Sequence, residues 1–379
     1  MSDGFVPGLA GIVAAESAIS TIDGANGVLR YRGILIEELA EHSSFEEVSF
    51  LLLNNKLPTA AELADFDARL RGLREIPESV INLLKSLPAE THPMVALQAA
   101  SAALAGAFPH FDVVTNPQGN EDAVLRMIAC FPTIVAAFDR IRKGKEIVAP
   151  NAELNHAGNF FYMLNGETPD ELQTKILDVA LVLHAEHGFN ASTFTCRVVG
   201  SAEANPYSAV SAAVGTLSGP LHGGANERVL HMLNAIEGGV DGVEPWFKEA
   251  LANKAKIMGL GHRVYKVKDP RAFALQKLAR DLFASHGSTP LYDMAHKLET
   301  LAAESIGAKG IAPNVDFYSG LVYEKLGMEI DLFTPFFAIA RVSGWGAHYC
   351  EQLSNNRIYR PTQKYVGTVE ATYTPMAER

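Results

Sequence analysis

The chain has 379 residues, of which 48% are hydrophobic and 20% charged, so it can bury a large core and is not expected to be disordered as a whole. Its net charge of −11 argues against a general nucleic-acid binder and against binding to an anionic membrane, because both need clustered Lys and Arg. Local arginines can still bind an acidic substrate. The three cysteines form no CxxC pattern, which favours neither a disulfide framework nor a thiolate zinc site. The start carries no secretory pattern, and we expect a cytoplasmic protein.

Helix signals dominate the chain and predict about fifteen helices over well over half of the residues. Ser44 and Thr59 each stand three residues before a glutamate, which is typical of a capping box. Proline suits a first helical turn, where its missing N–H has no partner, and glycine commonly follows a last turn. Residues in such positions are Pro77, Pro93, Pro169, Pro206, Pro270 and Pro290, and then Gly188, Gly287, Gly307 and Gly327.

Strand-like alternation is confined to two segments, residues 28–35 and the tail at residues 365–373. Without a βαβ rhythm, the sequence predicts an all-α fold and excludes doubly wound and barrel folds. The helix expected over residues 94–108 is rich in Ala and Ser and has no polar face, so it lies in the core or at a subunit interface. The helix-breaking pair at residues 219–220 marks a candidate domain boundary.

The first motif that can carry chemistry is GPLHGGANE, residues 219–227, which places His222 just before a helix that begins near Gly224. The partial positive charge of a helix N-terminus disfavours an imidazolium ion. A neutral His222 could therefore donate a hydrogen bond to a carbonyl oxygen. Taken alone, the motif is better explained by a histidine packed in a turn.

The second motif is MGLGHRVYKVKDPR, residues 258–271, in which two glycines expose backbone amides before His262. Exposed amides beside basic side chains suit phosphates or carboxylates. The match to a dinucleotide fingerprint is poor, since the third glycine and the preceding strand are missing. A solvated basic loop is the alternative. The basic residues in question are Lys266, Lys268 and Arg271.

The third motif is GIAPNVDFYSG, residues 310–320, where Asn314 can cap a helix and Asp316 lies in its first turn. Asp316 either complements the helix dipole or, if apolar neighbours raise its pKa, acts as a general base.

Two histidines in LHAEHGFN, His184 and His187, raise the question of a metal site. Zinc proteases need His at i and i+4 with Glu beside the first, which this spacing does not provide. We therefore expect no metal here, and interpret the pair as histidines at the end of a helix.

Together and in this order, these segments resemble the citrate synthase family over nearly the whole chain, from GLAGIVAAESAIS and LRYRG to NNRIYRP. The resemblance implies a catalytic triad of His222, His262 and Asp316. It also implies a site for oxaloacetate. Arg74 is a looser candidate for a residue that binds oxaloacetate or CoA. The implied oxaloacetate-binding residues are His187, Arg271 in KDPR, Arg341 in AIARVSGWGAH and Arg360 in RIYRP, the last reaching into the site of a partner subunit.

The implied reaction forms a carbon–carbon bond without metal or redox cofactor, and the CoA thioester is a substrate. Asp316 would take a proton from the methyl group of acetyl-CoA while His222 donates a hydrogen bond to the thioester oxygen. His262 would polarise the oxaloacetate carbonyl, and citryl-CoA would be hydrolysed to citrate and CoA. CoA would lie along Lys256, Ile257, Met258, Gly259, Leu260 and Gly261, with Lys309 or Lys256 near its phosphates.

The resemblance further implies a helical fold with a large domain, residues 1–222 and 324–379, and a small inserted domain, residues 223–323. It implies a homodimeric acyltransferase of the tricarboxylic acid cycle with no NADH site. From the net charge we expect no nucleic-acid or membrane partner.

The acyl-CoA substrate is the main open alternative. The segment LFTPFFAIARVSGWGAHYCEQ resembles the 2-methylcitrate synthase branch, which uses propionyl-CoA. One methylene changes selectivity by only about 1–3 kcal/mol, so a few side chains in the acyl pocket can decide. We favour citrate synthase with propionyl-CoA side activity over a dedicated 2-methylcitrate synthase in propionate breakdown. A non-catalytic helical scaffold and a zinc hydrolase are the alternatives from other classes.

Overall fold

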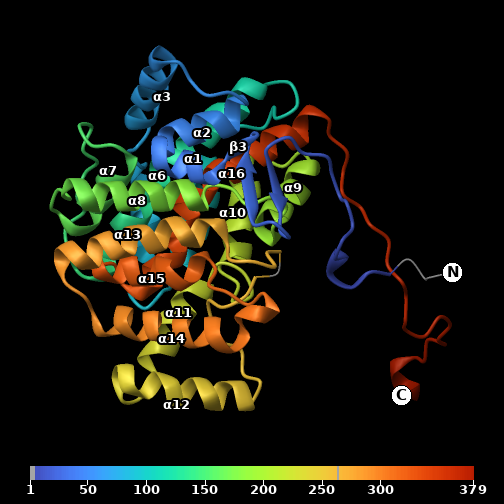
Figure 1. Cartoon of the computed structure of the whole chain (residues 1–379). Helices are drawn as coiled ribbons and strands as arrows, with labels where there is room; N and C mark the ends of the chain where they lie inside the picture. Colours follow the sequence, from blue (N-terminus) through green and yellow to red (C-terminus); the bar gives the residue numbers. More distant parts are fainter. Residues whose placement is uncertain (1–4, 263) are drawn as a thin grey trace.

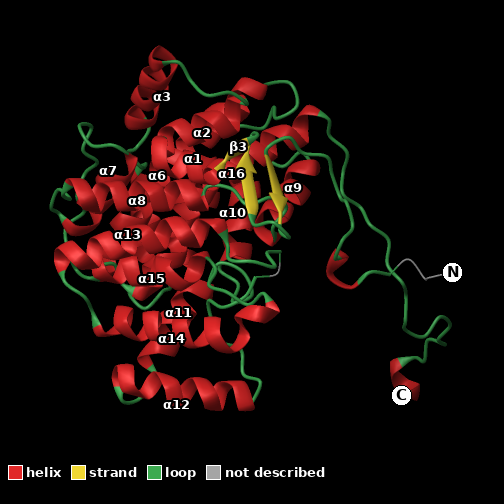
Figure 2. Ribbon diagram, viewed as in Figure 1, coloured by secondary structure: helices red, strands yellow, loops and turns green. Residues whose placement is uncertain are grey.

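The computed structural model describes residues 5–262 and 264–379. These residues form sixteen α-helices and one small antiparallel sheet (Figures 1 and 2). The predicted all-α fold is therefore confirmed. Within the described ranges, no helix combines the length and the apolar character that a membrane span requires.

The N-terminal half of the chain contributes the sheet and ten helices. The elements are η1 (Pro7–Leu9), β1 (Ser20–Asp23), β2 (Val28–Tyr31), β3 (Ile34–Leu35), α1 (Ile36–His42), α2 (Phe45–Asn54), α3 (Ala60–Gly72), α4 (Glu78–Ser86), α5 (Pro93–Ala107), α6 (Pro117–Arg142), α7 (His156–Asn165), α8 (Glu171–His184), α9 (Ala191–Ser201) and α10 (Pro206–Leu217).

The C-terminal half contributes six helices and ends in an extended arm. The elements are α11 (Ala225–Asn234), α12 (Gly239–Ala252), α13 (Pro270–His286), α14 (Pro290–Ile306), η2 (Gly307–Lys309), α15 (Val315–Lys325), η3 (Ile330–Leu332), α16 (Phe333–Ser354) and η4 (Met376–Glu378).

Local signals place most helix ends as predicted. Thr59 forms a complete capping box with Glu62 at the start of α3. Ser44 accepts from the backbone N–H of Glu47, but the Glu47 carboxylate accepts from the Ser43 hydroxyl, so this box is only half formed. Pro93, Pro206, Pro270 and Pro290 all stand in first turns, where no N–H is needed.

The sheet confirms one strand prediction and contradicts the other. Residues 28–35 form β2 and β3, and β1, which the sequence did not suggest, pairs antiparallel with β2. The tail at residues 365–373 contains no strand among its described residues and runs out as an exposed arm, with Val366 86% exposed. Alternation alone does not make a strand, because a strand also needs a partner for its backbone hydrogen bonds.

Helix α16 lies at the centre of the molecule, and every residue from Phe333 to Tyr349 is buried. It packs against α2, α5, α6, α8, α9 and α10. A Cβ added at Gly346 would lie 2.1 Å from Cγ1 of Val124 on α6, so the two helices can approach this closely only because residue 346 has no side chain. Glycine thus fixes the position of the helix that carries Arg341.

Helices α11 to α15 pack mainly on one another and form the lower part of the view in Figure 1. They meet the rest of the chain through α11 against α16 and through α13 against α1 and α8. The turn after β1 also reaches this group, because Gly24 O accepts a hydrogen bond from Lys266 N at 2.8 Å. The division at residues 223 and 323 stays a prediction.

We predict that Gly346→Ala lowers the free energy of unfolding by about 1–3 kcal/mol, because the added methyl overpacks the contact between α16 and α6. Gly72→Ala is the matched control: Gly72 ends α3, and a Cβ there meets no atom within 4 Å. Denaturant unfolding of both variants measures the difference. An equal effect of the two substitutions would contradict the close packing at Gly346.

Candidate active site

His222 lies in the turn between α10 and α11, as predicted, and the structure indicates its tautomer. The backbone N–H of Ser192 donates to Nε2 at 3.3 Å, and Ser192 Oγ lies 2.8 Å from the same nitrogen. Because the backbone hydrogen is fixed, Nε2 must be an acceptor, and the proton of the neutral ring then lies on Nδ1. Burial, followed by the charge of Arg341, lowers the pKa of His222 to about 4. A neutral ring with an available Nδ1–H is therefore the form at pH 7.

His262 has the opposite tautomer. Its Nδ1 accepts the backbone N–H groups of Val264, at 3.0 Å, and Tyr265, at 3.2 Å, so Nε2 carries the proton. Its ring lies 5.4 Å from that of His187 and 4.8 Å from that of Tyr265, measured between centroids. Burial, with the charge of Arg271, lowers the pKa of His262 to about 4.

Asp316 stands in the first turn of α15, and Asn314 caps that helix by accepting from Asp316 N at 2.9 Å. Asn314 also ties this turn to the His262 loop: its N–H donates to Gly259 O, and its side chain donates to Gly261 O, both at 2.9 Å. The hydrogen bond from Gly261 N to Ala312 O, at 2.8 Å, completes the connection. The second and third motifs are thus one structural unit.

The environment of Asp316 favours the role of a general base over that of a charge that only complements the helix dipole. Burial raises the pKa of its carboxylate to about 6, against the opposing charges of Arg271 and Arg341, and no hydrogen bond from the described residues contributes to this shift. A carboxylate whose pKa is raised toward neutral pH is a better proton acceptor and is still mostly ionised at pH 7. The helix-dipole explanation does not account for this raised pKa.

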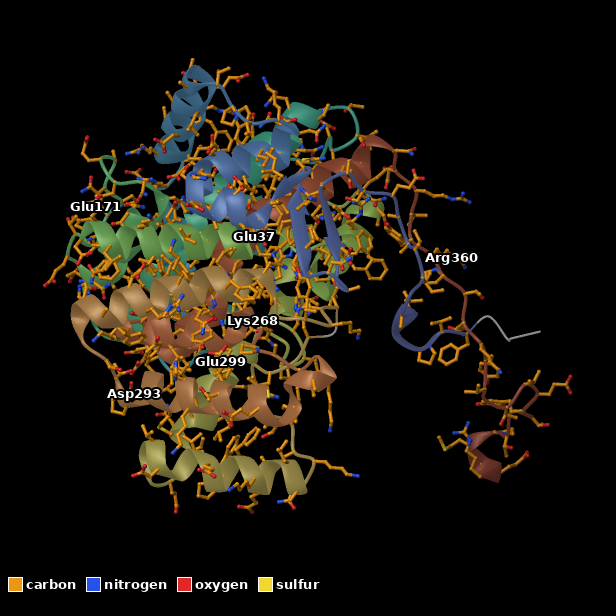
Figure 3. The ribbon with its side chains drawn as sticks, viewed as in Figure 1. Glu37, Glu171, Lys268, Asp293, Glu299 and Arg360 are labelled. Carbon is orange, nitrogen blue, oxygen red and sulfur yellow. The ribbon has the colours of Figure 1, made fainter. Side chains whose placement is uncertain are left out.

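Two buried arginines supply positive charge at the same place. Arg271 forms a two-pronged pair with Asp269, from Nε at 3.0 Å and from Nη2 at 2.7 Å. Arg341 donates from Nε to His184 O at 2.7 Å, and its guanidinium lies over the ring of Phe337 at 4.7 Å. The alternative of a solvated basic loop is therefore wrong for Arg271. It is wrong for Lys268 as well, which binds Gln276 and Glu299 (Figure 3).

His187 joins this group from the turn after α8. Its Nε2 lies 3.0 Å from Tyr265 Oη, and its side chain is almost fully buried. Burial and then the charges of Arg271 and Arg341 hold its pKa well below the ordinary value. The ring is therefore neutral and can donate or accept a hydrogen bond beside the two arginines.

Two predicted substrate residues lie apart from this group. Arg74 is fully buried after α3, where it donates to Asn151 O at 2.8 Å and its charged neighbours are Glu46, Asp67 and Arg71. The structure therefore does not bring Arg74 to the triad through any described polar contact. Arg360 is exposed and lies on the C-terminal arm, away from the body of its own chain (Figure 3).

The predicted CoA segment, residues 256–261, forms the loop after α12. Ile257 and Gly259 are buried, whereas Lys256 is exposed, and so is Lys309 in η2. Gly259 has φ +79°, and a Cβ there would lie 2.8 Å from atoms of Phe317 and Val229. Only glycine allows this loop to lie so close to α11 and α15.

Sequence reasoning missed several partners of these residues. Asp269 was visible in KDPR as an acid two positions before Arg271, and its pairing could have been proposed from that spacing. Ser192 and Trp345 gave no signal, because they come from distant helices: Ser192 bonds His222, and Trp345 Nε1 donates to Ser192 Oγ at 3.1 Å. In the part of the chain that the structure describes, no group of three or more His, Cys, Asp or Glu side chains is arranged to hold a metal ion.

The chain is similar to known proteins along almost its whole length. The family model described as "Citrate synthase, C-terminal domain" matches residues 8–362. A citrate synthase of Synechocystis sp. is 54% identical over 375 residues, which cover 99% of this chain and 94% of that protein. A 2-methylcitrate synthase of Mycobacterium tuberculosis is 41% identical over 360 residues, which cover 95% and 90%.

Solved structures agree with the sequence comparison. Citrate synthase from Thermotoga maritima matches with a TM-score of 0.89 and 40% identity, covering 98% of each chain. A citrate synthase from Thermoplasma acidophilum, described as a ternary complex with carboxymethyl coenzyme A and oxaloacetate, matches with a TM-score of 0.91 and 34% identity over 97% of this chain and 98% of that one. By sequence and by fold, the chain belongs to the citrate synthase family.

Proposed function

We propose that this protein condenses acetyl-CoA with oxaloacetate and hydrolyses citryl-CoA, with His222, His262 and Asp316 as its catalytic residues. The observation that supports the proposal is a carboxylate of raised pKa and two neutral histidines of opposite tautomer, all three under the charge of Arg271 or Arg341. The chemistry needs a weak base and two neutral hydrogen-bond donors, and no electron transfer. The proposed reaction therefore uses no metal or redox cofactor.

The three side chains have complementary roles in this proposal. Asp316 takes a proton from the methyl group next to the thioester, and Nδ1–H of His222 stabilises the enol oxygen that forms. Nε2–H of His262 donates to the ketone oxygen of oxaloacetate while the enol carbon attacks the carbonyl carbon. Because both rings are neutral at pH 7, each offers a donor without the cost of burying an ion.

The dianion oxaloacetate fits the buried positive charge. Arg271 and Arg341 lie beside His187, and their charges reach His262, His222 and Asp316 through the low-dielectric interior. Guanidinium groups suit this task because they bind carboxylates through two parallel hydrogen bonds. Among the oxaloacetate residues, Arg360 would come from a partner subunit.

CoA is proposed to lie along residues 256–261. Its negatively charged phosphates would meet the exposed cations Lys256 and Lys309, which stand on the two loops that Asn314 joins. Closure of residues 223–323 over oxaloacetate would exclude water from the enol intermediate. A cytoplasmic location stays a prediction of the sequence.

The pH profile tests the role of Asp316. We expect kcat/KM for acetyl-CoA to fall about tenfold per pH unit below an apparent pKa near 6, because the active form of the base is the carboxylate, which is lost as pH falls. His222 and His262, with pKa values of about 4, stay neutral in the same window and add no second step above pH 5.

Asp316→Asn is the control for this profile. It should lower kcat by about 100-fold or more and remove the inflection, while oxaloacetate still binds. A profile unchanged in Asp316→Asn would assign the titration to another group.

The acyl-CoA preference separates the two members of the family. The 2-methylcitrate synthase similarity makes propionyl-CoA the second candidate substrate. We expect a higher kcat/KM with acetyl-CoA than with propionyl-CoA, by about 10- to 100-fold if one methylene is discriminated in the usual range. Free-CoA release with oxaloacetate and each thioester measures the ratio. Equal or higher efficiency with propionyl-CoA would identify a 2-methylcitrate synthase, and no release with either would contradict the proposed reaction.

Mixed dimers test whether Arg360 acts in the partner's site. Arg360→Ala and His222→Ala should each be nearly inactive. After equal mixing under subunit exchange, about one quarter of wild-type activity should return, since half of the dimers are mixed and each has one intact site. If Arg360 served its own chain, each mixed dimer would carry one defect in each of its two sites, and the mixture of the two variants would stay inactive.

A further inference from the structure

Glu186 is a fully buried carboxylate beside the proposed oxaloacetate site, and the mechanism does not use it. It precedes His187 and has an exposed fraction of 0%. The charge of Arg341 reaches it, yet among the described residues the two form neither a hydrogen bond nor an ion pair within 4.0 Å. A buried anion gains most from a direct pair with a buried cation, so the absence of such a pair here needs a physical cause.

That cause lies in two donors on one oxygen of Glu186. His348 Nε2 lies 3.1 Å from Oε1, and Ser20 Oγ donates to the same atom at 2.9 Å. The other oxygen, Oε2, is buried without a hydrogen-bond partner among the described residues, against the backbone of α16 at Gly344. A Cβ at Gly344 would lie 2.5 Å from Oε2, so residue 344 must be glycine for the carboxylate to fit.

The donor on His348 is fixed from its far side. Arg197 Nη1 lies 3.1 Å from His348 Nδ1 and must donate, because a guanidinium has no acceptor. Nδ1 is therefore unprotonated, and the proton of the ring points from Nε2 to Glu186. Arg197 is held in turn by Glu351 at 2.7 Å and by Gln352 at 3.0 Å. In the row Glu351–Arg197–His348–Glu186, here called the Glu186 relay, Arg197 donates both to Glu351 and to His348, and His348 in turn donates to Glu186.

Helical spacing brings the relay and the substrate arginine to the same turn. Arg341, Gly344 and His348 lie three and four residues apart on one face of α16. Each of the three meets residues 184–186. Arg341 donates to His184 O, Gly344 lies against Ala185 O and Glu186 Oε2, and His348 donates to Glu186 Oε1. The face that supplies Arg341 therefore also holds the carboxylate that could compete for it.

We infer that His348 is a positioning residue that, through the Glu186 relay, keeps the Glu186 carboxylate off Arg341 and so leaves the Arg341 guanidinium free for a carboxylate of oxaloacetate. The inference rests on the proposed function, in which Arg341 binds oxaloacetate. The negative charge of Glu186 still balances the buried positive charge of Arg341. Its carboxylate does not accept a hydrogen bond from the Arg341 guanidinium.

The test compares three changes at the relay in the full-length protein. In His348→Leu the carboxylate keeps only Ser20 Oγ as a donor and turns to Arg341. We expect KM and Kd for oxaloacetate to rise about tenfold, the scale of one charge-assisted hydrogen bond, with a smaller change in kcat. His348→Gln keeps one donor and one acceptor and should restore most of the affinity. In the double variant His348→Leu with Glu186→Gln, the competing charge is absent, and oxaloacetate affinity should return to within about threefold of wild type.

His156→Leu is the matched control. His156 is also a histidine with 1% exposure, but it lies in the cluster of Arg74 and Glu46 and outside the relay. It should change the unfolding temperature without changing KM for oxaloacetate. If His348→Leu behaves like this control, or if Glu186→Gln does not rescue it, the relay has only a structural role and the inference is overturned.

Arg341→Ala separates the inference from the function on which it rests. Isothermal titration with oxaloacetate should show a large loss of affinity in this variant. Unchanged affinity would overturn the proposed substrate site and the relay with it. Lost affinity in Arg341→Ala together with wild-type affinity in His348→Leu would overturn the relay alone.

Discussion

The burial of α16 from Phe333 to Tyr349 is the constraint on which the site depends. A helix surrounded by other helices has no solvent-facing side for its polar residues, so each of them must find a partner inside the protein. Arg341, Trp345 and His348 do so at His184 O, Ser192 and Glu186, which belong to two other segments. Glycines in α16 allow these approaches. Packing and site geometry are therefore parts of one arrangement.

Burial also sets the chemistry of the side chains. The same removal of water that lowers the pKa values of His222 and His262 raises that of Asp316, because in each case the charged form is disfavoured. The arginines cannot lose their charge in this way and need partners. For Arg271, burial alone would lower the pKa, and the paired Asp269 more than offsets it. The neutral histidines and the Arg271–Asp269 ion pair thus have a single physical origin, the exclusion of water.

Much of the fold and of the site could be predicted from local signals. Caps and first-turn prolines act within a few residues of chain, so Thr59, Pro206 and Asn314 marked real helix starts. The tail at residues 365–373 shows where such signals fail, because a strand depends on a partner that alternation does not specify. Arg74 shows another limit: its type suits an anion, but its burial among Glu46 and Asn151 follows from packing.

The sequence by itself determined which side chains can do chemistry, because the residue types and glycine-flanked turns of the three motifs are encoded locally. His222, His262 and Asp316 were all marked in this way. Tertiary structure alone decided how these groups are set for reaction. The tautomer of His222 depends on Ser192, thirty residues away, and the orientation of Glu186 depends on His348 and Arg197 from two other helices. Hydrogen-bond partners and loss of water arise only when distant segments pack, so no local pattern can state them.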